Sequence, residues 1–273
     1  MTAIIGFIGG GNMAASLIGG MIQAGRAASE IIVAEPDIER GQALSQQFGV
    51  VTTQDNTATL QCDSLILAVK PQVMRKVCEQ LQTAMGSPAP LFISIAAGIV
   101  SRDIDRWLGG DRAIVRCMPN TPALLQCGAT GMVANERVST AQKQLAETIL
   151  AAVGLTVWVE SEDQINAVTA VSGSGPAYFF LMMEAMQAAG EQLGLTADTA
   201  QQLVLQTALG AARMASEKQI PPATLRQQVT SKGGTTEQAI ASFERNHFRQ
   251  IVMQALQAAN DRSISLAEEL AKA

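Results

Sequence analysis

The feature that most constrains the fold lies in the first fifteen residues. An apolar run, residues 3–8, breaks into the glycines Gly9, Gly10 and Gly11 and resumes as an apolar helical pattern from Ala14. This order predicts a strand, a tight turn and a helix. In the spacing G-x-G-x-x-A, Gly9 allows the turn, Gly11 lets the backbone approach a pyrophosphate, and Ala14 lets the helix pack on the strand. The pattern predicts a dinucleotide site; an ordinary glycine turn is the alternative.

A second apolar strand, residues 31–34, ends in Glu35. Dinucleotide-binding folds place an acid at this spacing, where it accepts a hydrogen bond from a ribose hydroxyl. A carboxylate also repels the 2′-phosphate of NADPH, so Glu35 favours NADH. Arg40 follows closely enough to restore phosphate binding, which leaves the use of both dinucleotides open.

Beyond Glu35, strand and helix patterns alternate. Strands are expected at residues 64–69, 91–95, 113–117, 130–133 and 156–159, and helices at 38–48, 73–84, 101–108 and 140–153. This alternation predicts a doubly wound parallel sheet of the Rossmann type.

Ligands of such sheets bind beyond the carboxyl ends of the strands. The segments there are 68–71, 96–98 and 118–122. Their small residues permit close approach of a flat ring, and Lys70 and Asn120 are polar groups able to face it. Ordinary strand-to-helix turns are the alternative.

Strand patterns end near residue 160, and helical stretches continue to the end of the chain, with a kink expected at Ser172–Pro176. We therefore expect a dinucleotide-binding domain at 1–160 and a helical domain at 161–273. The helices of the second domain are apolar on nearly all sides, and a domain of about 110 residues cannot bury several such helices. Dimerisation through this domain is expected.

A second glycine turn, with Gly233 and Gly234, lies inside the helical domain and precedes a helix. Thr235 and Gln238 have capping-box spacing. Exposed N–H groups at such a helix start suit a phosphate or a carboxylate. An ordinary capped helix is the alternative.

Composition excludes several classes of function. The chain of 273 residues has a net charge of −5, with 19 basic and 24 acidic residues, and it shows no basic cluster of the kind that nucleic-acid binding needs. Its four cysteines lack metal-site spacing, so we expect buried free thiols and no metal. No signal peptide or membrane span is evident, which predicts a cytoplasmic protein.

Few side chains are available as proton donors. Tyr178 lacks the lysine four residues later that one dehydrogenase class uses, and no Lys or Arg lies between Lys143 and Arg213. The single histidine, His247, is expected in a turn or cap. A protonated imine would suit this chain, because such a substrate already carries the charge that attracts a hydride.

Six segments together resemble pyrroline-5-carboxylate reductases over essentially the full length. They are residues 7–13, 68–71, 96–98, 118–122, 172–178 and 231–236. The resemblance implies reduction of 1-pyrroline-5-carboxylate to L-proline, with NADPH or NADH as the cofactor and no metal. It also implies a homodimer in which the partner's helical domain supplies or supports the substrate turn, and in some members a decamer.

The resemblance also assigns residues. The sequence pattern and the resemblance together predict these cofactor residues: Ile8, Gly9, Gly10, Gly11, Asn12, Met13, Glu35, Pro36, Asn56, Ala68, Val69, Lys70, Pro71, Ala96, Ala97, Gly98 and Asn120. The implied substrate residues are Glu162, Glu217, Val229, Ser231, Gly233, Gly234, Thr235 and Thr236. The Thr236 hydroxyl would meet the ring nitrogen as the catalytic group, and the glycine turn would bind the substrate carboxylate. The active site is expected where the two glycine turns face each other.

Two alternatives remain open at this point. The same fold permits a reductase of another cyclic imine or of a hydroxyacid, because fold does not fix substrate. A nucleotide-sensing protein without catalysis is the third possibility.

Overall fold

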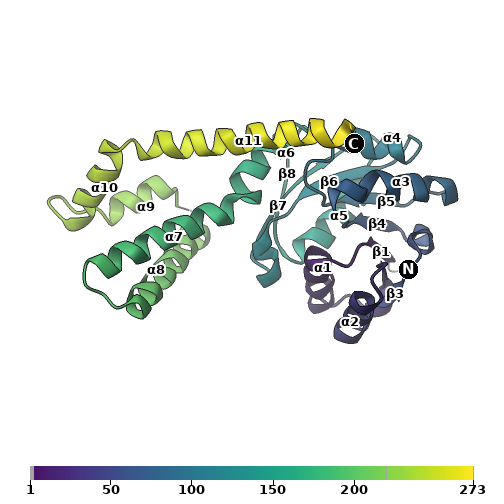
Figure 1. Cartoon of the computed structure of the whole chain (residues 1–273), viewed down its shortest axis with the longest axis horizontal. Helices are drawn as coiled ribbons and strands as arrows, with labels where there is room; N and C mark the ends of the chain where they lie inside the picture. Colours follow the sequence, from purple (N-terminus) through teal and green to yellow (C-terminus); the bar gives the residue numbers. More distant parts are fainter. Residues whose placement is uncertain (1–2, 219, 273) are drawn as a thin grey trace. The chain divides into compact units, whose positions relative to one another are not determined.

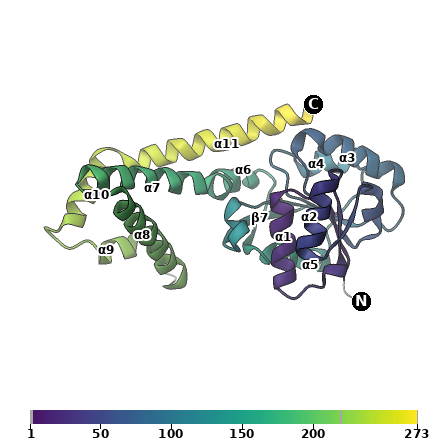
Figure 2. The same ribbon diagram turned by 60° about the horizontal axis from the view of Figure 1, so that its bottom comes forward.

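The computed structural model describes residues 3–218 and 220–272. They form two compact units, one of residues 3–174 with 259–272 and one of residues 175–258 (Figures 1 and 2). The last helix, α11 (Phe248–Lys272), contributes to both units. These two units are defined by the contacts within each of them, and they do not test the domain boundary that we expected at residue 160, which stays a prediction.

An eight-stranded sheet forms the centre of the first unit. Its strands are β1 (Ile5–Ile8), β2 (Ile31–Ala34), β3 (Val51–Thr53), β4 (Ser64–Leu67), β5 (Leu91–Ser94), β6 (Ile114–Met118), β7 (Gly128–Ala134) and β8 (Gly154–Trp158). Their order is β3-β2-β1-β4-β5-β6-β7-β8. Ile5 of β1 pairs with Ile31 on one side and with Ser64 on the other, so the sequence order reverses at β1. The doubly wound fold expected from the sequence is confirmed.

The sheet is not parallel throughout. Strands β1 to β6 run parallel, whereas β7 is antiparallel to β6 and β8 is parallel to β7. The connection over residues 119–127 is a short loop with a 3₁₀ turn, Thr121–Leu125. A parallel crossover needs a dozen or more residues, so this loop returns the chain beside β6 in the opposite direction.

Helices cover both faces of the sheet. They are α1 (Asn12–Gln23), α2 (Ile38–Phe48), α3 (Pro71–Ala84), α4 (Ser101–Trp107), α5 (Thr140–Ala151) and α6 (Gln164–Val168). Helices α1, α2 and α5 enclose one apolar core with the sheet. Helices α3 and α4 enclose the other, and Leu270 of α11 packs against it. Figure 2 shows α1, α2 and α5 together on one face of this unit.

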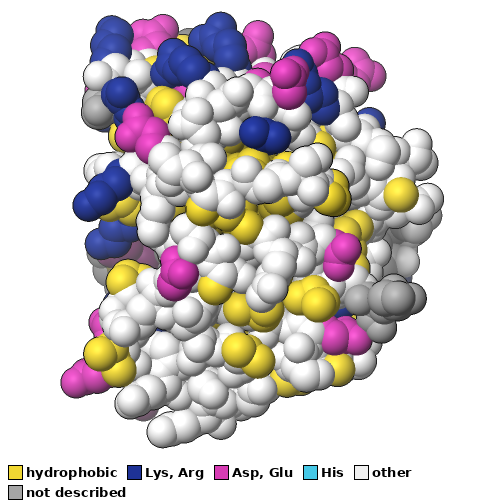
Figure 3. Space-filling view, turned by 90° about the vertical axis from the view of Figure 1, so that its right-hand side faces the viewer, with side chains coloured by type: hydrophobic (Ala, Val, Ile, Leu, Met, Phe, Trp, Pro, Cys, Tyr) yellow, Lys and Arg dark blue, Asp and Glu magenta, His cyan; other side chains and the backbone are white. Residues whose placement is uncertain are grey.

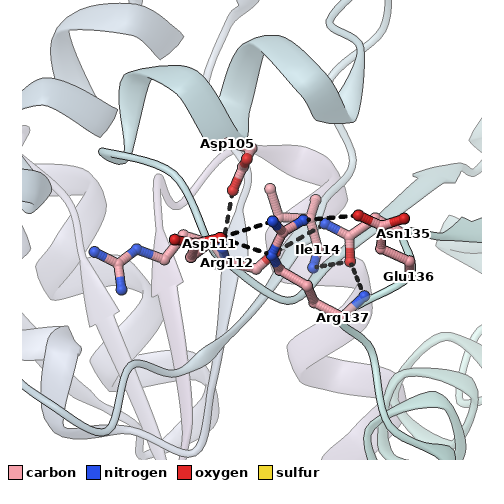
Figure 4. Close-up of polar contacts among 7 residues, drawn as sticks. All are labelled: Asp105, Asp111, Arg112, Ile114, Asn135, Glu136 and Arg137. Atoms are coloured by element: carbon pink, nitrogen blue, oxygen red, sulfur yellow. Dashed lines mark hydrogen bonds and ion pairs between the residues drawn. The ribbon is translucent and has the colours of Figure 1, made fainter.

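A polar network holds the antiparallel pair at the amino end of β6 (Figure 4). The Asn135 side chain accepts a hydrogen bond from Ile114 N–H at 3.2 Å and donates one to the Arg112 carbonyl at 2.8 Å. Arg137 binds Asp111, with Nη2 2.7 Å from Oδ1. These contacts lie at the opposite end of β6 from the predicted cofactor segments, so they serve the fold.

The second unit is entirely helical within its described residues. It contains α7 (Gly175–Gln192), α8 (Ala197–Lys218), α9 (Pro222–Gln228), α10 (Thr235–Arg245) and the first part of α11. Large apolar side chains stay exposed on these helices: Phe179, Phe180, Leu181, Leu203, Leu205, Leu209, Ile251 and Met253. Such a surface is typical of a region that packs against another protein.

Three local features expected from the sequence are present. The kink expected at Ser172–Pro176 is a π-helical turn that begins three residues earlier, Thr169–Gly173, and α7 already begins at Gly175. Thr196 caps α8, because its Oγ1 accepts from Thr199 N–H. His247 has a φ of +57° and separates α10 from α11, so it is the turn residue that we expected.

The cysteine prediction is right for three residues and wrong for the fourth. Cys62, Cys78 and Cys117 are buried, whereas Cys127 is exposed, since it lies in the loop between β6 and β7. Burial raises the pKa of the Cys62 thiol to about 11 and that of Cys78 to about 12, so both stay protonated at neutral pH.

The surface charges, the metal-ligating side chains and the length of the helices bear on which ligands or membranes the protein could bind. Figure 3 shows Lys or Arg and Asp or Glu side chains interspersed along the upper edge of one face, above mainly uncharged atoms. In the part of the chain that the structure describes, no three metal-ligating side chains gather. None of its helices is long and apolar enough to cross a membrane.

Candidate nucleotide and substrate sites

The turn between β1 and α1 has the backbone geometry of a phosphate cradle. Gly9 has a φ of +94°, and a Cβ there would lie 2.6 Å from the Ala68 carbonyl oxygen, so only glycine fits. Gly11 differs, because none of the described atoms beyond its own chain neighbours lies within 4 Å of where its Cβ would be. Gly11 directly precedes α1, and no side chain caps that helix. Open space beside uncapped helix N–H groups fits a pyrophosphate.

Glu35 braces this turn from the end of β2. The side chain is buried, at 5% exposure. Its Oε2 accepts a 2.7 Å hydrogen bond from Gly10 N–H, and its Oε1 accepts a 3.0 Å bond from Asp37 N–H. Arg40 Nη1 lies 3.7 Å from Oε2. The carboxylate therefore holds the glycine turn in addition to the ribose contact that the sequence predicts for it.

The other predicted cofactor segments meet at the same edge of the sheet, because β1, β4 and β5 are neighbours. Lys70 precedes α3, and Pro71 opens that helix. Gly98, with a φ of +74°, lies in the connection after β5. The residues gathered at and beyond the carboxyl ends of these strands and of β2 are Ile8, Gly9, Gly10, Gly11, Asn12, Met13, Glu35, Pro36, Ala68, Val69, Lys70, Pro71, Ala96, Ala97 and Gly98.

Asn56 and Asn120 have side chains engaged with the protein itself. Asn56 opens the 3₁₀ turn after β3, and its Nδ2 donates to Gln80 Oε1 at 3.0 Å. Asn120 follows β6; its Nδ2 donates to the Ser172 carbonyl at 3.0 Å, and its Oδ1 accepts from Ala129 N–H at 2.9 Å. Asn120 thus ties the start of β7 to the π-helical turn.

The second glycine turn is present, with a different capping arrangement. Gly233 has a φ of +75°, and Gly234 is the N-cap of α10 without a side-chain capping bond. The capping box expected from Thr235 is therefore wrong, because Thr235 is already the first helical residue. The Glu237 side chain reaches back instead, and its Oε2 accepts from Gly233 N–H at 2.7 Å. The helix nevertheless begins where the sequence predicted.

The remaining predicted substrate residues are distributed between the two units. Val229, Ser231 and Thr235 are exposed and Thr236 is half-buried in the second unit. Glu217 is exposed on α8, where its Oε1 accepts from Arg213 Nε at 2.8 Å. Glu162 belongs to the first unit and follows β8.

Sequence reasoning missed Arg116, whose side chain is only 2% exposed in the middle of β6. Arg116 Nη1 donates to Glu162 Oε1 at 2.9 Å. Glu162 also accepts from Ser101, through N–H at 2.9 Å and Oγ at 2.8 Å. The available signal was a single arginine inside the apolar strand IVRCM, because a buried charge requires a partner.

Comparison with known proteins decides the family. The chain matches the pyrroline-5-carboxylate reductase dimerisation family over residues 162–266 and the family described as NADP oxidoreductase coenzyme F420-dependent over residues 4–98. It is 52% identical to the pyrroline-5-carboxylate reductase of Pseudomonas aeruginosa, over 98% of both chains. The chain belongs to the pyrroline-5-carboxylate reductase family.

Other members of this family agree in sequence and structure. The pyrroline-5-carboxylate reductase of Haemophilus influenzae is 46% identical, over 95% of this chain and 96% of that protein. The structure of the Coxiella burnetii reductase is 49% identical and superposes with a TM-score of 0.94, over 97% of this chain and 99% of the other. The Plasmodium falciparum reductase, with NADP bound, is 28% identical with a TM-score of 0.84, over 97% and 98%.

Proposed function

We propose that this protein reduces 1-pyrroline-5-carboxylate to L-proline with NAD(P)H, the last step of proline biosynthesis. The observation that carries the proposal is its 52% identity to a pyrroline-5-carboxylate reductase over 98% of both chains. The open cradle at Gly11 supports it independently, since a bound pyrophosphate fits there. When bound, NAD(P)H supplies the hydride that adds to C5 of the protonated imine.

The protein's own residues bind and orient the cofactor in this proposal. The turn from Gly9 to Met13 holds the pyrophosphate on helix N–H groups. The turns at 68–71 and 96–98 lie at the carboxyl ends of β4 and β5 and line the remainder of the dinucleotide. Asn56 lies near the adenosine ribose. Asn120 supports this edge through Ser172 and Ala129.

The second glycine turn binds the substrate. The substrate carboxylate accepts hydrogen bonds from Ser231, Gly234 and Thr235, beside Val229 and Gly233. In the structure, Gly233 N–H donates a hydrogen bond to the Glu237 carboxylate, so one N–H of this turn already binds a carboxylate. The Thr236 hydroxyl, on the first turn of α10, orients the ring nitrogen so that C5 faces the hydride. Glu217 lies on the substrate side, as the family resemblance implies.

Because of Glu35, we propose that NADH is the preferred cofactor. The buried carboxylate of Glu35 repels a 2′-phosphate and accepts from a free ribose hydroxyl. Arg40, 3.7 Å from Glu35, offsets part of that repulsion and leaves NADPH usable. The Plasmodium falciparum relative has NADP bound, which supports keeping NADPH as a possible cofactor in the proposal.

We propose a cytoplasmic homodimer as the working assembly. The match to the dimerisation family over residues 162–266 and the exposed apolar side chains of α7, α8 and α11 support the dimer. The resemblance extends the proposal to a decamer built of dimers. Sedimentation velocity of the full chain distinguishes the two assemblies.

One experiment tests the proposed function. Oxidation of NADH and of NADPH is followed with pyrroline-5-carboxylate and with a second cyclic imine, and reduction of NAD⁺ and NADP⁺ is followed with hydroxyacids. Pyrroline-5-carboxylate is expected to give the highest kcat/KM. A higher kcat/KM on another substrate would replace the assigned reaction, and dinucleotide binding without any turnover would support the nucleotide-sensing alternative.

A further inference from the structure

The connection between β5 and α4, residues 95–100, carries the cofactor turn at 96–98. Its Gly98 adopts a φ of +74°. Contacts from residues much later in the chain hold this connection at two places, and all of them belong to the first compact unit. This arrangement assigns a role to Glu162 that differs from the substrate contact implied by the family resemblance.

The first support acts where the connection ends, at Ser101. Both donors of Ser101 point to Glu162, with N–H 2.9 Å from Oε1 and Oγ 2.8 Å from Oε2. Arg116 Nη1 approaches Oε1 from the sheet at 2.9 Å. Arg116 is 2% exposed and Glu162 is 31% exposed, so the ion pair is largely shielded from water. A shielded charge pair with three hydrogen bonds fixes Ser101 firmly.

The second support lies under the turn itself. A Cβ on Gly98 would be 2.9 Å from Leu270 Cδ1 and 3.3 Å from Leu266 Cγ, so both leucines of α11 lie against the glycine backbone. Ser263 Oγ donates to Asn166 Oδ1 at 2.8 Å and holds this part of α11 on α6. The connection is therefore held at its end by Ser101 and packed at Gly98 against the leucines of α11.

We propose that Glu162 is a positioning residue for the dinucleotide, and that it acts through Ser101 on the connection at residues 95–100. The inference rests on the proposed function, in which segment 96–98 lines the cofactor. Both oxygens of Glu162 are already bonded to Ser101, which argues for support of the cofactor turn over direct contact with substrate.

The test compares Ser101→Ala, Glu162→Gln and the double variant in the full dimeric enzyme. The dissociation constant for NADH is measured by fluorescence titration, and KM and kcat are measured with pyrroline-5-carboxylate. Each single variant is expected to weaken NADH binding about tenfold, the equivalent of one charge-assisted hydrogen bond. The double variant is expected to bind NADH as weakly as the more weakly binding of the two single variants, because both substitutions disrupt the same Ser101–Glu162 interaction. The KM for the imine should stay near the native value.

Ser139→Ala is the matched control. Ser139 caps α5 through a capping box, so Ser139→Ala also removes a bonded serine hydroxyl at a helix start, and it costs about 1 kcal/mol of stability away from the connection. NADH binding by this variant should equal that of the native enzyme. Leu270→Ala, which empties the underside of Gly98, should weaken NADH binding in the same direction as Ser101→Ala.

Two outcomes would overturn the proposal. A raised KM for the imine with native NADH affinity would make Glu162 a substrate contact. If Ser139→Ala weakened NADH binding equally, the weaker binding would be due to a general loss of stability and not to the Ser101–Glu162 contact. The native enzyme separates this inference from the proposed function: if it binds NADH without reducing pyrroline-5-carboxylate, the function fails, and the NADH titrations still decide the role of Glu162.

Discussion

The backbone N–H of Gly10 donates a 2.7 Å hydrogen bond to Oε2 of the buried Glu35. This bond joins the two parts of the sequence from which the cofactor was predicted, the glycine turn after β1 and the acid after β2. A Cβ on Gly10 would lie 3.2 Å from the same oxygen, so the turn and the carboxylate are packed together. Any change at Glu35 therefore affects the shape of the turn as well as the charge that a ribose meets.

Replacement of Glu35 by serine should shift cofactor use toward NADPH. The change removes the charge that faces a 2′-phosphate and removes one of the two carboxylates near Arg40, so Arg40 can pair with the phosphate more readily. We expect the ratio of kcat/KM for NADPH to that for NADH to rise about tenfold or more, since one like-charge repulsion is removed. NADH binding should also weaken, because Gly10 N–H loses its acceptor.

Asp37→Ser is the control for that substitution. Asp37 also lies near Arg40, at 3.7 Å, and it is half exposed, but its side chain does not bond to the glycine turn. Its loss should change the cofactor ratio less and leave NADH affinity near native. A native enzyme that strongly prefers NADPH would show that the interpretation of Glu35 is wrong.

Gly9→Ala and Gly11→Ala should separate stability from cofactor binding. Alanine at Gly9 would require a left-handed backbone and would place Cβ 2.6 Å from a carbonyl oxygen, so unfolding should become easier by about 2 kcal/mol or more. Alanine at Gly11 enters open space and should leave the urea midpoint unchanged. It should still abolish NADH binding, because the methyl group occupies the pyrophosphate space. If Gly11→Ala bound NADH with native affinity, the pyrophosphate would not bind beside Gly11 as proposed.

Thr236→Ala should lower kcat with pyrroline-5-carboxylate about a hundredfold, if its hydroxyl orients the imine. NADH affinity should stay native, since Thr236 lies in the helical unit. Thr236→Ser should restore most of the rate. Thr230→Ala provides a nearby control, because its hydroxyl donates to the Arg226 carbonyl at 2.6 Å and has no assigned role in the reaction. Unchanged kcat in Thr236→Ala would exclude the assigned role.

The sequence predicted those parts of the fold that local patterns determine. Apolar strands, such as residues 31–34, and capped helices, such as the one that follows Ser139, appear at or within a few residues of their expected positions. The strand β3 (Val51–Thr53) was missed, because three residues, two of them threonine, give no periodic signal. The reversal of β7 was also missed, since strand direction depends on the path of the connecting loop.

The candidate site was predictable where a glycine conformation carried the signal, as at Gly9 and Gly233. It was not predictable where distant residues meet. The pair of Arg116 and Glu162 spans 46 positions, and no local pattern links an arginine in one strand to an acid after another. The Gly98 contact with α11 likewise depends on the return of the C-terminal helix to the sheet.

The four thiols should differ sharply in reactivity. Cys127 is exposed and should react first with Ellman's reagent in the native enzyme. Burial raises the pKa of Cys62 to about 11 and that of Cys78 to about 12, so these thiols stay protonated and shielded even at pH 9. One fast equivalent is expected for the native enzyme and none for Cys127→Ser. Two or more fast equivalents would contradict the described burial.

Asn120→Ala should distinguish support of the site from contact with the cofactor. The substitution leaves the Ser172 carbonyl and the Ala129 N–H without their partner, so the free energy of unfolding in urea should fall by about 2 kcal/mol. If Asn120 acts on the cofactor edge, NADH binding should weaken as well.

Asn135→Ala is the matched control, because Asn135, near the other end of β6, likewise accepts from one backbone N–H and donates to one backbone carbonyl. It should lose a similar free energy of unfolding, because an N–H and a carbonyl again lose their partner. Since its network lies at the amino end of β6, away from the carboxyl ends of β1, β4 and β5, NADH affinity should stay native. Equal loss of NADH affinity in both variants would mean that the β6 and β7 pair acts through overall stability, and native affinity in both would remove Asn120 from the cofactor site.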